Sequence, residues 1–268
     1  MIGPALQVAS LLLVAFIGFA AHRASLCTVR AVHEVLVERR ARMLASFAKA
    51  ALWAAMIYGT VLLTLPGAFR GFSVYEPPWL GLAGGFAFGV GAAINGGCSL
   101  STLQRLVDGD ARMLTSLAGL CLGVGLWSAA DAALGVTRLV HSFVVWERIG
   151  DAAWAPLAVL WLLAAGELTR LWRSRPRGAG AWRALGGAEY RLGSAALILG
   201  LSGGLLYGLI GQWTYTNYLR SGVDWLQRGA PSPGVFHAAL FFALLGGMAG
   251  SALQRGSFRR RRAPAPGG

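Results

Sequence analysis

The stretch Asn95-Gly96-Gly97-Cys98-Ser99-Leu100-Ser101-Thr102 lies between two strongly hydrophobic segments of the chain. It combines two glycines, a thiol and three hydroxyl groups, which membrane helices rarely carry together unless a ligand approaches the backbone. The glycines allow the helix to break, so that backbone N–H groups become free to face a small ligand beside the Cys98 sulfur. The stretch therefore predicts a broken membrane helix with a binding function.

A second thiol, Cys27, has a similar setting in His22-Arg23-Ala24-Ser25-Leu26-Cys27-Thr28. Arg23 and Arg30 flank it, and these cations would attract an anion and favour the thiolate. The alternative is an ordinary cysteine in a loop at the membrane interface. A lone histidine at such an interface is usually structural, and this is the preferred interpretation of His22.

The composition indicates a membrane protein. Of the 268 residues, 56% are hydrophobic and only 13% are charged, whereas a soluble domain is about 25% charged. The formal net charge of +13 does not indicate a nucleic-acid partner, because the arginines lie between apolar runs and no nucleic-acid motif accompanies them. We expect an all-α, polytopic protein that forms a single membrane domain over residues 1–268.

The apolar runs predict about seven spans. They cover residues 2–21, 44–65, 79–97, 113–134, 152–169, 193–211 and 234–254. The connections after the first, third, fifth and last spans carry 19 of the 24 Lys and Arg residues. By the positive-inside rule, the N-terminus is predicted outside and the C-terminus in the cytoplasm of a bacterial inner membrane.

Several connections carry structure of their own. Residues 28–40 have an amphipathic pattern and predict a short interfacial or re-entrant helix. Residues 99–107 predict another, in which Ser101 and Gln104 have the spacing of a capping box. Residues 173–191 are rich in Arg, Pro and Gly and resemble a cytoplasmic linker between two halves. Residues 255–268 are expected to form a disordered basic tail that anchors the inner face, and contact with lipid headgroups is the alternative role.

The chain also contains a weak internal repeat. The segment Gly84-Gly85-Phe86-Ala87-Phe88-Gly89 is similar to Gly203-Gly204-Leu205-Leu206-Tyr207-Gly208. Each opens a span that ends in a glycine-containing break, followed by hydroxyl or amide residues and an arginine. The predicted topology puts the two breaks on opposite sides, which indicates two pseudo-symmetric inverted halves, residues 1–134 and 152–254. Duplicated hairpins without a transport function are the alternative.

These motifs resemble the YeeE/YedE family of sulfur-compound transporters, which includes thiosulfate importers of the TsuA type. The resemblance rests on Cys27 with its neighbours and on the Gly96-Gly97-Cys98 segment, and it extends loosely over most of the chain. It implies a narrow path between two halves, on which thiols pass thiosulfate inward through transient S–H···S contacts. The importers carry a third cysteine in the second half, where Trp213 stands here.

The candidate path residues follow from these motifs. Cys98 at a helix N-terminus would meet an anion with free N–H groups and a thiol, or it is a small residue that allows close packing. Cys121 is expected to be a packing residue. The substrate-path candidates are Cys27, Gly96, Gly97, Cys98, Ser99, Ser101, Thr102, Gln212 and Asn217.

No cofactor or metal is expected, because the sequence has neither CxxC or HExxH spacing nor a Walker motif. We predict a transporter, not an enzyme, that imports a small inorganic sulfur anion such as thiosulfate. One rival is a membrane thiol enzyme that carries sulfane sulfur as a persulfide. Another is a non-transporting partner that docks a cytoplasmic sulfurtransferase or sulfur-carrier protein on its basic inner face.

Overall fold

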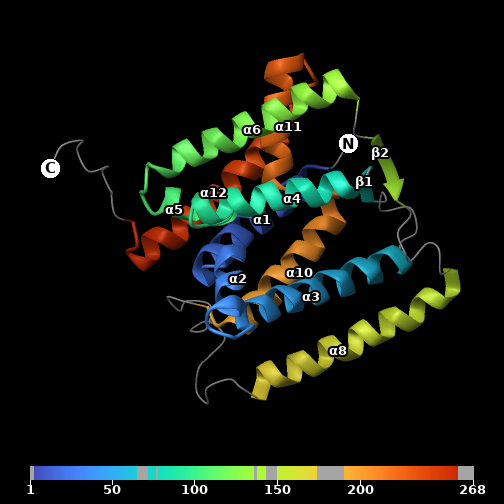
Figure 1. The fold of residues 1–268 in the computed structure, drawn as a ribbon. Helices are drawn as coiled ribbons and strands as arrows, with labels where there is room; N and C mark the ends of the chain where they lie inside the picture. Colours follow the sequence, from blue (N-terminus) through green and yellow to red (C-terminus); the bar gives the residue numbers. More distant parts are fainter. Residues whose placement is uncertain are drawn as a thin grey trace.

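The computed structural model describes residues 3–64, 72–76, 78–135, 138–142, 150–173 and 190–258. Among these residues, seven helices are long and apolar enough to cross a membrane (Figure 1). They are α1 (Pro4–Ala24), α3 (Arg42–Thr64), α4 (Pro78–Ile94), α6 (Met113–Leu134), α8 (Trp154–Arg173), α10 (Leu192–Ile210) and α12 (Val235–Arg255). The predicted all-α, polytopic class is confirmed, and each helix lies within a few residues of a predicted span.

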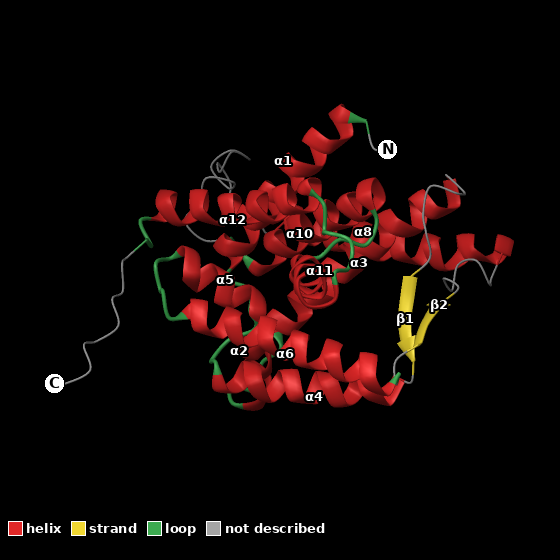
Figure 2. Cartoon of the chain, turned by 90° about the horizontal axis from the view of Figure 1, so that it is seen from above, coloured by secondary structure: helices red, strands yellow, loops and turns green. Residues whose placement is uncertain are grey.

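Among the described residues, three shorter helices lie in connections between the spans. They are α2 (Thr28–Leu36), α5 (Ser99–Val107) and α11 (Tyr215–Arg228), and a 3-10 turn, η1 (Gly150–Ala153), precedes α8. The α2 helix ends four residues before its predicted limit, because the Arg40 N–H bonds back to the Glu34 carbonyl and Arg39 adopts a positive φ of 54°. The α11 helix runs across the long helices and appears nearly end-on in Figure 2.

Two short strands lie outside the helices and were not predicted from the sequence. Strand β1 (Phe72–Glu76) follows α3, and strand β2 (Arg138–Ser142) follows α6. They pair antiparallel, with Val74 opposite Val140. The connections after the second and fourth spans therefore lie on the same face, as alternating crossings require.

Glycines bring two pairs of helices into close contact. A Cβ on Gly18 of α1 would overlap the Leu244 carbonyl of α12, and one on Gly247 would overlap the Ala15 carbonyl. A Cβ on Gly204 of α10 would lie 3.1 Å from the Ala54 carbonyl oxygen of α3. Small residues at crossings let helix backbones approach each other, and this packing stabilises helix pairs in a membrane.

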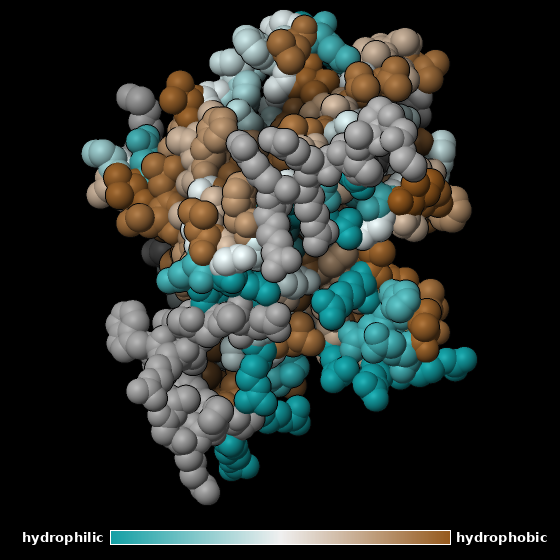
Figure 3. Space-filling model, turned by 90° about the vertical axis from the view of Figure 1, so that its left-hand side faces the viewer, coloured by the Kyte–Doolittle hydropathy of each residue, from teal (hydrophilic) through white to brown (hydrophobic). Residues whose placement is uncertain are grey.

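Hydrophilic residues gather at the end of the molecule where α12 ends, which Figure 3 shows in teal. Most of the predicted linker and of the predicted basic tail, residues 174–189 and 259–268, lies outside the described residues. The helix–break–helix order is shared by α4–α5 and α10–α11. The inverted symmetry of the two halves stays a prediction.

Candidate functional site

The α4 helix breaks where the sequence predicted. Gly96 has φ +67°, a conformation that favours glycine, and its N–H bonds to the Ala93 carbonyl. A Cβ on Gly97 would overlap Ser101 Oγ, so a side chain here would displace the Ser101 hydroxyl from its bond to the Cys98 carbonyl. After this turn, Cys98 is the N-cap residue of α5.

The second thiol occupies the equivalent place on another short helix. Ser25 ends α1 in a left-handed conformation with φ 48°, and Cys27 is the N-cap residue of α2. Cys27 and Cys98 are both buried, with 9% and 8% of their surfaces exposed. Two thiols that are 71 positions apart in the sequence thus have the same local geometry.

The N-termini of α2 and α5 converge on the Cys27 sulfur. Cys27 Sγ lies 3.6 Å from Ser101 Oγ of α5, and the backbone N–H groups of Cys98, Val29 and Arg30 at the starts of the two helices act on the sulfur electrostatically. Free N–H groups and the positive ends of two helix dipoles favour a negatively charged group at this point. The geometry is therefore suited to a thiolate or to a small anion beside a thiol.

Two hydroxyl groups of α5, those of Ser101 and Thr102, bond within the helix and do not form the predicted capping box. Ser101 Oγ and Thr102 Oγ1 both donate to the Cys98 carbonyl, at 2.9 and 3.1 Å. Gln104 Nε2 donates instead to the Ala21 carbonyl of α1, at 3.0 Å. The helix begins three residues earlier than a Ser101 cap would place it, because the break at Gly96 and Gly97 already frees the chain to turn.

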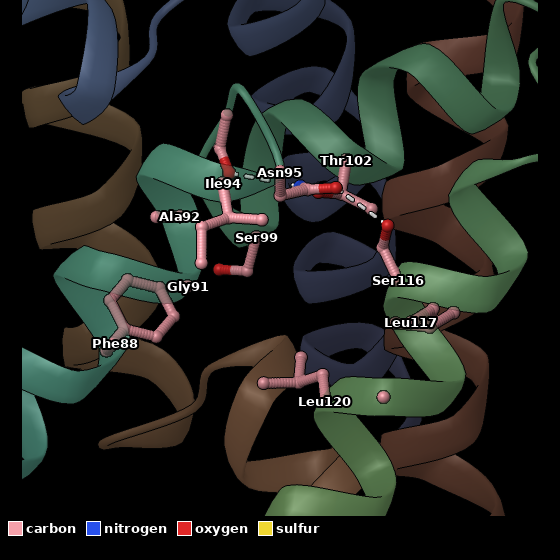
Figure 4. A pocket seen from close by; sticks show the side chains of 12 residues that line it. Phe88, Gly91, Ala92, Ile94, Asn95, Ser99, Thr102, Ser116, Leu117 and Leu120 are labelled. Atoms are coloured by element: carbon pink, nitrogen blue, oxygen red, sulfur yellow. Dashed lines mark hydrogen bonds between the residues drawn. The ribbon is translucent and has the colours of Figure 1, made fainter.

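A pocket of about 540 Å³ adjoins the break and is lined by α4, α5 and α6 (Figure 4). Asn95 organises one side of it: Nδ2 donates to Thr102 Oγ1 at 2.9 Å, and Oδ1 accepts from Ser116 Oγ at 2.7 Å. Ser99 also lines this pocket. The sequence motif contained Asn95 but gave no reason to pair it with Ser116, which lies in the next span.

The second half of the chain reaches the thiols through Tyr215. Tyr215 Oη lies 2.6 Å from Ser99 Oγ, so the N-terminus of α11 meets the N-terminus of α5. Gln212 and Asn217, the predicted path residues of this half, have exposed side chains, and the Asn217 N–H bonds to the Thr214 cap. Tyr215 belongs to the same stretch, where an aromatic residue is equally compatible with a membrane-interface belt.

A polar network ties the far end of α5 to α1 and α12. His22 is only 2% exposed, and its ring nitrogens lie 3.0 Å from Ser251 Oγ and 3.1 Å from Asp108 Oδ1. Ser257 Oγ also donates to Asp108 Oδ1, at 2.6 Å. His22 is therefore part of a buried network, in agreement with the structural role preferred from the sequence, although it is neither isolated nor at an exposed interface.

Two other residues discussed in the sequence analysis, Arg23 and Cys121, do not line the pocket beside the α4–α5 break. Arg23 is buried beside His22, where its guanidinium lies 4.5 Å from the centre of the Phe19 ring and bonds to Gln254. Cys121 is partly exposed midway along α6. Within the described part of the chain, no group of three His, Cys, Asp or Glu side chains is placed to hold a metal ion.

The fold and the site define a multi-pass membrane protein in which two buried cysteines stand at the N-cap positions of short helices inside a bundle of spans. A family model described as sulphur transport matches residues 23–266, nearly the whole chain. The protein belongs to this sulphur transport family, the YeeE/YedE family. A search of curated proteins finds no match.

Proposed function

We propose that this protein imports thiosulfate, or a closely related inorganic sulfur anion, along a path that passes Cys27 and Cys98. The observation that carries the proposal is the convergence of two helix N-termini on the Cys27 sulfur, with Ser101 Oγ at 3.6 Å. Membership of a sulphur transport family supports a sulfur-containing ligand. The identity of that ligand is inferred from the chemistry of the site.

Thiosulfate combines a double negative charge with a soft terminal sulfur. The N–H groups at the helix ends suit the charge, and the polarizable thiols suit the terminal sulfur. The Cys27 and Cys98 thiols would pass the ligand along by S–H···S contacts without a lasting covalent bond. This mechanism needs no cofactor and assigns no enzymatic step to the chain.

The other path residues support the thiols in different ways. Gly96 and Gly97 give the turn that exposes the Cys98 N–H, while Ser101 and Thr102 fix the first turn of α5 through the Cys98 carbonyl. Ser99 faces the pocket and contacts the second half. Gln212 and Asn217 are exposed at the break before α11, where we propose that they bind the ligand before it reaches the thiols.

We further propose that residues 1–268 form one domain in a bacterial inner membrane, with two halves, 1–134 and 152–254, and a cytoplasmic tail, 255–268. The excess of Arg and Lys on one side supports this orientation. The partners would be membrane lipid and, at the basic inner face, a soluble sulfur-carrier or sulfurtransferase protein that accepts the ligand.

Uptake of radiolabelled thiosulfate by proteoliposomes containing the purified protein tests the proposed function. We expect saturable uptake that unlabelled thiosulfate abolishes and sulfate reduces only weakly. Protein-free liposomes control for leakage. The absence of thiosulfate uptake by folded protein, together with uptake of another sulfur compound, would show that the path has a different ligand. Covalent labelling of a thiol during turnover would instead favour persulfide chemistry.

A further inference from the structure

A buried hydrogen-bond donor close to the thiol site has no partner. Trp213 Nε1 is enclosed by the protein, and no acceptor among the described residues lies within hydrogen-bonding distance of it. An indole N–H can only donate, and an unpaired buried donor is unfavourable and uncommon in folded proteins. Such a group is free to donate to an acceptor from outside the chain where a ligand passes close to it.

The position of Trp213 connects this donor with the proposed path. The residue lies two positions before Tyr215, whose hydroxyl is 2.6 Å from Ser99 Oγ, and Ser99 follows Cys98. Its ring packs against the buried cluster that contains Leu103 of α5. A turn bond from the Trp213 N–H to the Gly211 carbonyl, at 2.9 Å, fixes the backbone. The break before α11 therefore places Trp213 on a segment whose next helix contacts, through Tyr215, the helix that carries Cys98.

The two kinds of donor around this point suit different atoms of one ligand. A thiol is a soft, polarizable partner for a sulfane sulfur, whereas an N–H group is a directional donor to a charged oxygen. A sulfur oxyanion such as thiosulfate presents both kinds of atom, at opposite ends of one bond. Sulfide and thiocyanate present a soft sulfur but no oxygen.

We infer that the Trp213 indole N–H donates to an oxygen atom of the ligand, and that it selects sulfur oxyanions over sulfur compounds that carry no oxygen. The inference rests on the proposed function, because it gives the thiols the sulfane end of the ligand and Trp213 the oxygen-bearing end. It adds a specificity-determining residue in the second half of the chain, at the place where related importers are expected to carry a thiol.

Trp213→Phe tests the inference, because it keeps an aromatic ring and removes the N–H. Loss of one hydrogen bond to a charged oxygen corresponds to about tenfold weaker binding or more. We therefore expect the KM for radiolabelled thiosulfate to rise about tenfold. The inhibition constant (Ki) of sulfite should rise similarly, while the Ki of thiocyanate stays the same. Trp213→His retains a ring N–H and should recover part of the lost affinity.

Trp53→Phe is the matched control. Trp53 is 5% exposed on α3, and its Nε1 is also without a hydrogen-bond partner among the described residues, but it packs in a different cluster with Met56 and Ala164. This variant should keep the KM for thiosulfate and the ratio of the two inhibitors. If Trp213→Phe is not recovered folded, Trp213→Leu serves as a second variant without the N–H.

The outcomes separate the inference from the proposed function. Thiosulfate uptake by the wild type, with an unchanged KM and inhibitor ratio in a folded Trp213 variant, would overturn the role of the indole and leave the thiol path standing. An equal rise for sulfite and thiocyanate would show that Trp213 only shapes the path. No thiosulfate uptake by the wild type would contradict the proposed function itself.

Discussion

His22 Nε2 lies 3.1 Å from Asp108 Oδ1, and this pair joins the last turn of α1 to the turn that ends α5. The other ring nitrogen of His22 lies 3.0 Å from Ser251 Oγ of α12, so three segments meet at one buried side chain. The nine residues of α5 span about 13 Å and carry Cys98 at their opposite end. The position of the thiol therefore depends on an anchor at the far end of its helix.

Removal of this anchor should weaken both stability and transport. His22→Ala leaves Ser251 without its buried partner, which costs about 1–3 kcal/mol, and it frees the C-terminal end of α5. We expect a lower Tm in detergent and slower thiosulfate uptake. His33→Ala is the control, because His33 is exposed on α2; an equal effect of both substitutions would contradict the anchor.

Substitution of the central thiol should nearly abolish uptake. Cys98→Ala removes the thiol at the N-terminus of α5 without disturbing the first turn of that helix, whose bonds use the Cys98 carbonyl. Cys98→Ser should retain little activity, since oxygen is a harder and less polarizable partner for sulfur. Cys121→Ala, midway along α6, should leave uptake nearly normal. If both Cys98 variants show wild-type uptake at equal protein levels, Cys98 is not part of the transport path.

Tyr215→Phe should slow thiosulfate uptake several-fold. The change removes the hydroxyl that lies 2.6 Å from Ser99 Oγ, and a hydrogen bond of this kind contributes about 0.5–1.5 kcal/mol. Gln212→Ala or Asn217→Ala should also weaken uptake several-fold if these exposed side chains bind the incoming ligand. If both amide variants take up thiosulfate normally and only Tyr215→Phe is defective, the second half contributes to transport only through its contact with α5.

Gly247→Ala should destabilise the protein by several kcal/mol, because its Cβ would overlap the Ala15 carbonyl of α1 and a backbone carbonyl cannot move aside easily. Gly85→Ala in α4 is the control, since its Cβ meets nothing within 4 Å. Thermal unfolding in detergent should separate the two variants clearly. Equal Tm values would show that α1 and α12 can slide apart without loss.

The charge distribution predicts that Gly268 lies in the cytoplasm and Ala230 outside. Single cysteines at these positions, introduced into a variant without the native thiols, should differ in labelling by a membrane-impermeant maleimide. Only the cysteine that replaces Ala230 should react from the outside of intact cells, and both should react after lysis. Labelling of the Gly268 position in intact cells would reverse the orientation.

The sequence predicted the elements that depend on local patterns. Apolar runs located the spans, and the glycines before Cys98 located the break and the helix over residues 99–107. The contacts between elements were missed: Ser99 and Tyr215 are 116 positions apart, and His22 and Asp108 are 86 apart. A single sequence carries no local signal for such pairs. Strands β1 and β2 were not predicted for the same reason, because each is short and pairs with a segment that is distant in the sequence.

The close contact between α1 and α12 has a consequence for how the protein is made. The first span leaves the ribosome at the start of synthesis, but the surface around Gly18 that fits the Leu244 backbone finds its partner only when the last span arrives. The first helix therefore stays incompletely packed in the membrane until α12 has been synthesised and inserted. If synthesis terminated before Val235, α1 would lack its partner permanently. Its unpacked surface would remain exposed to the membrane quality-control machinery.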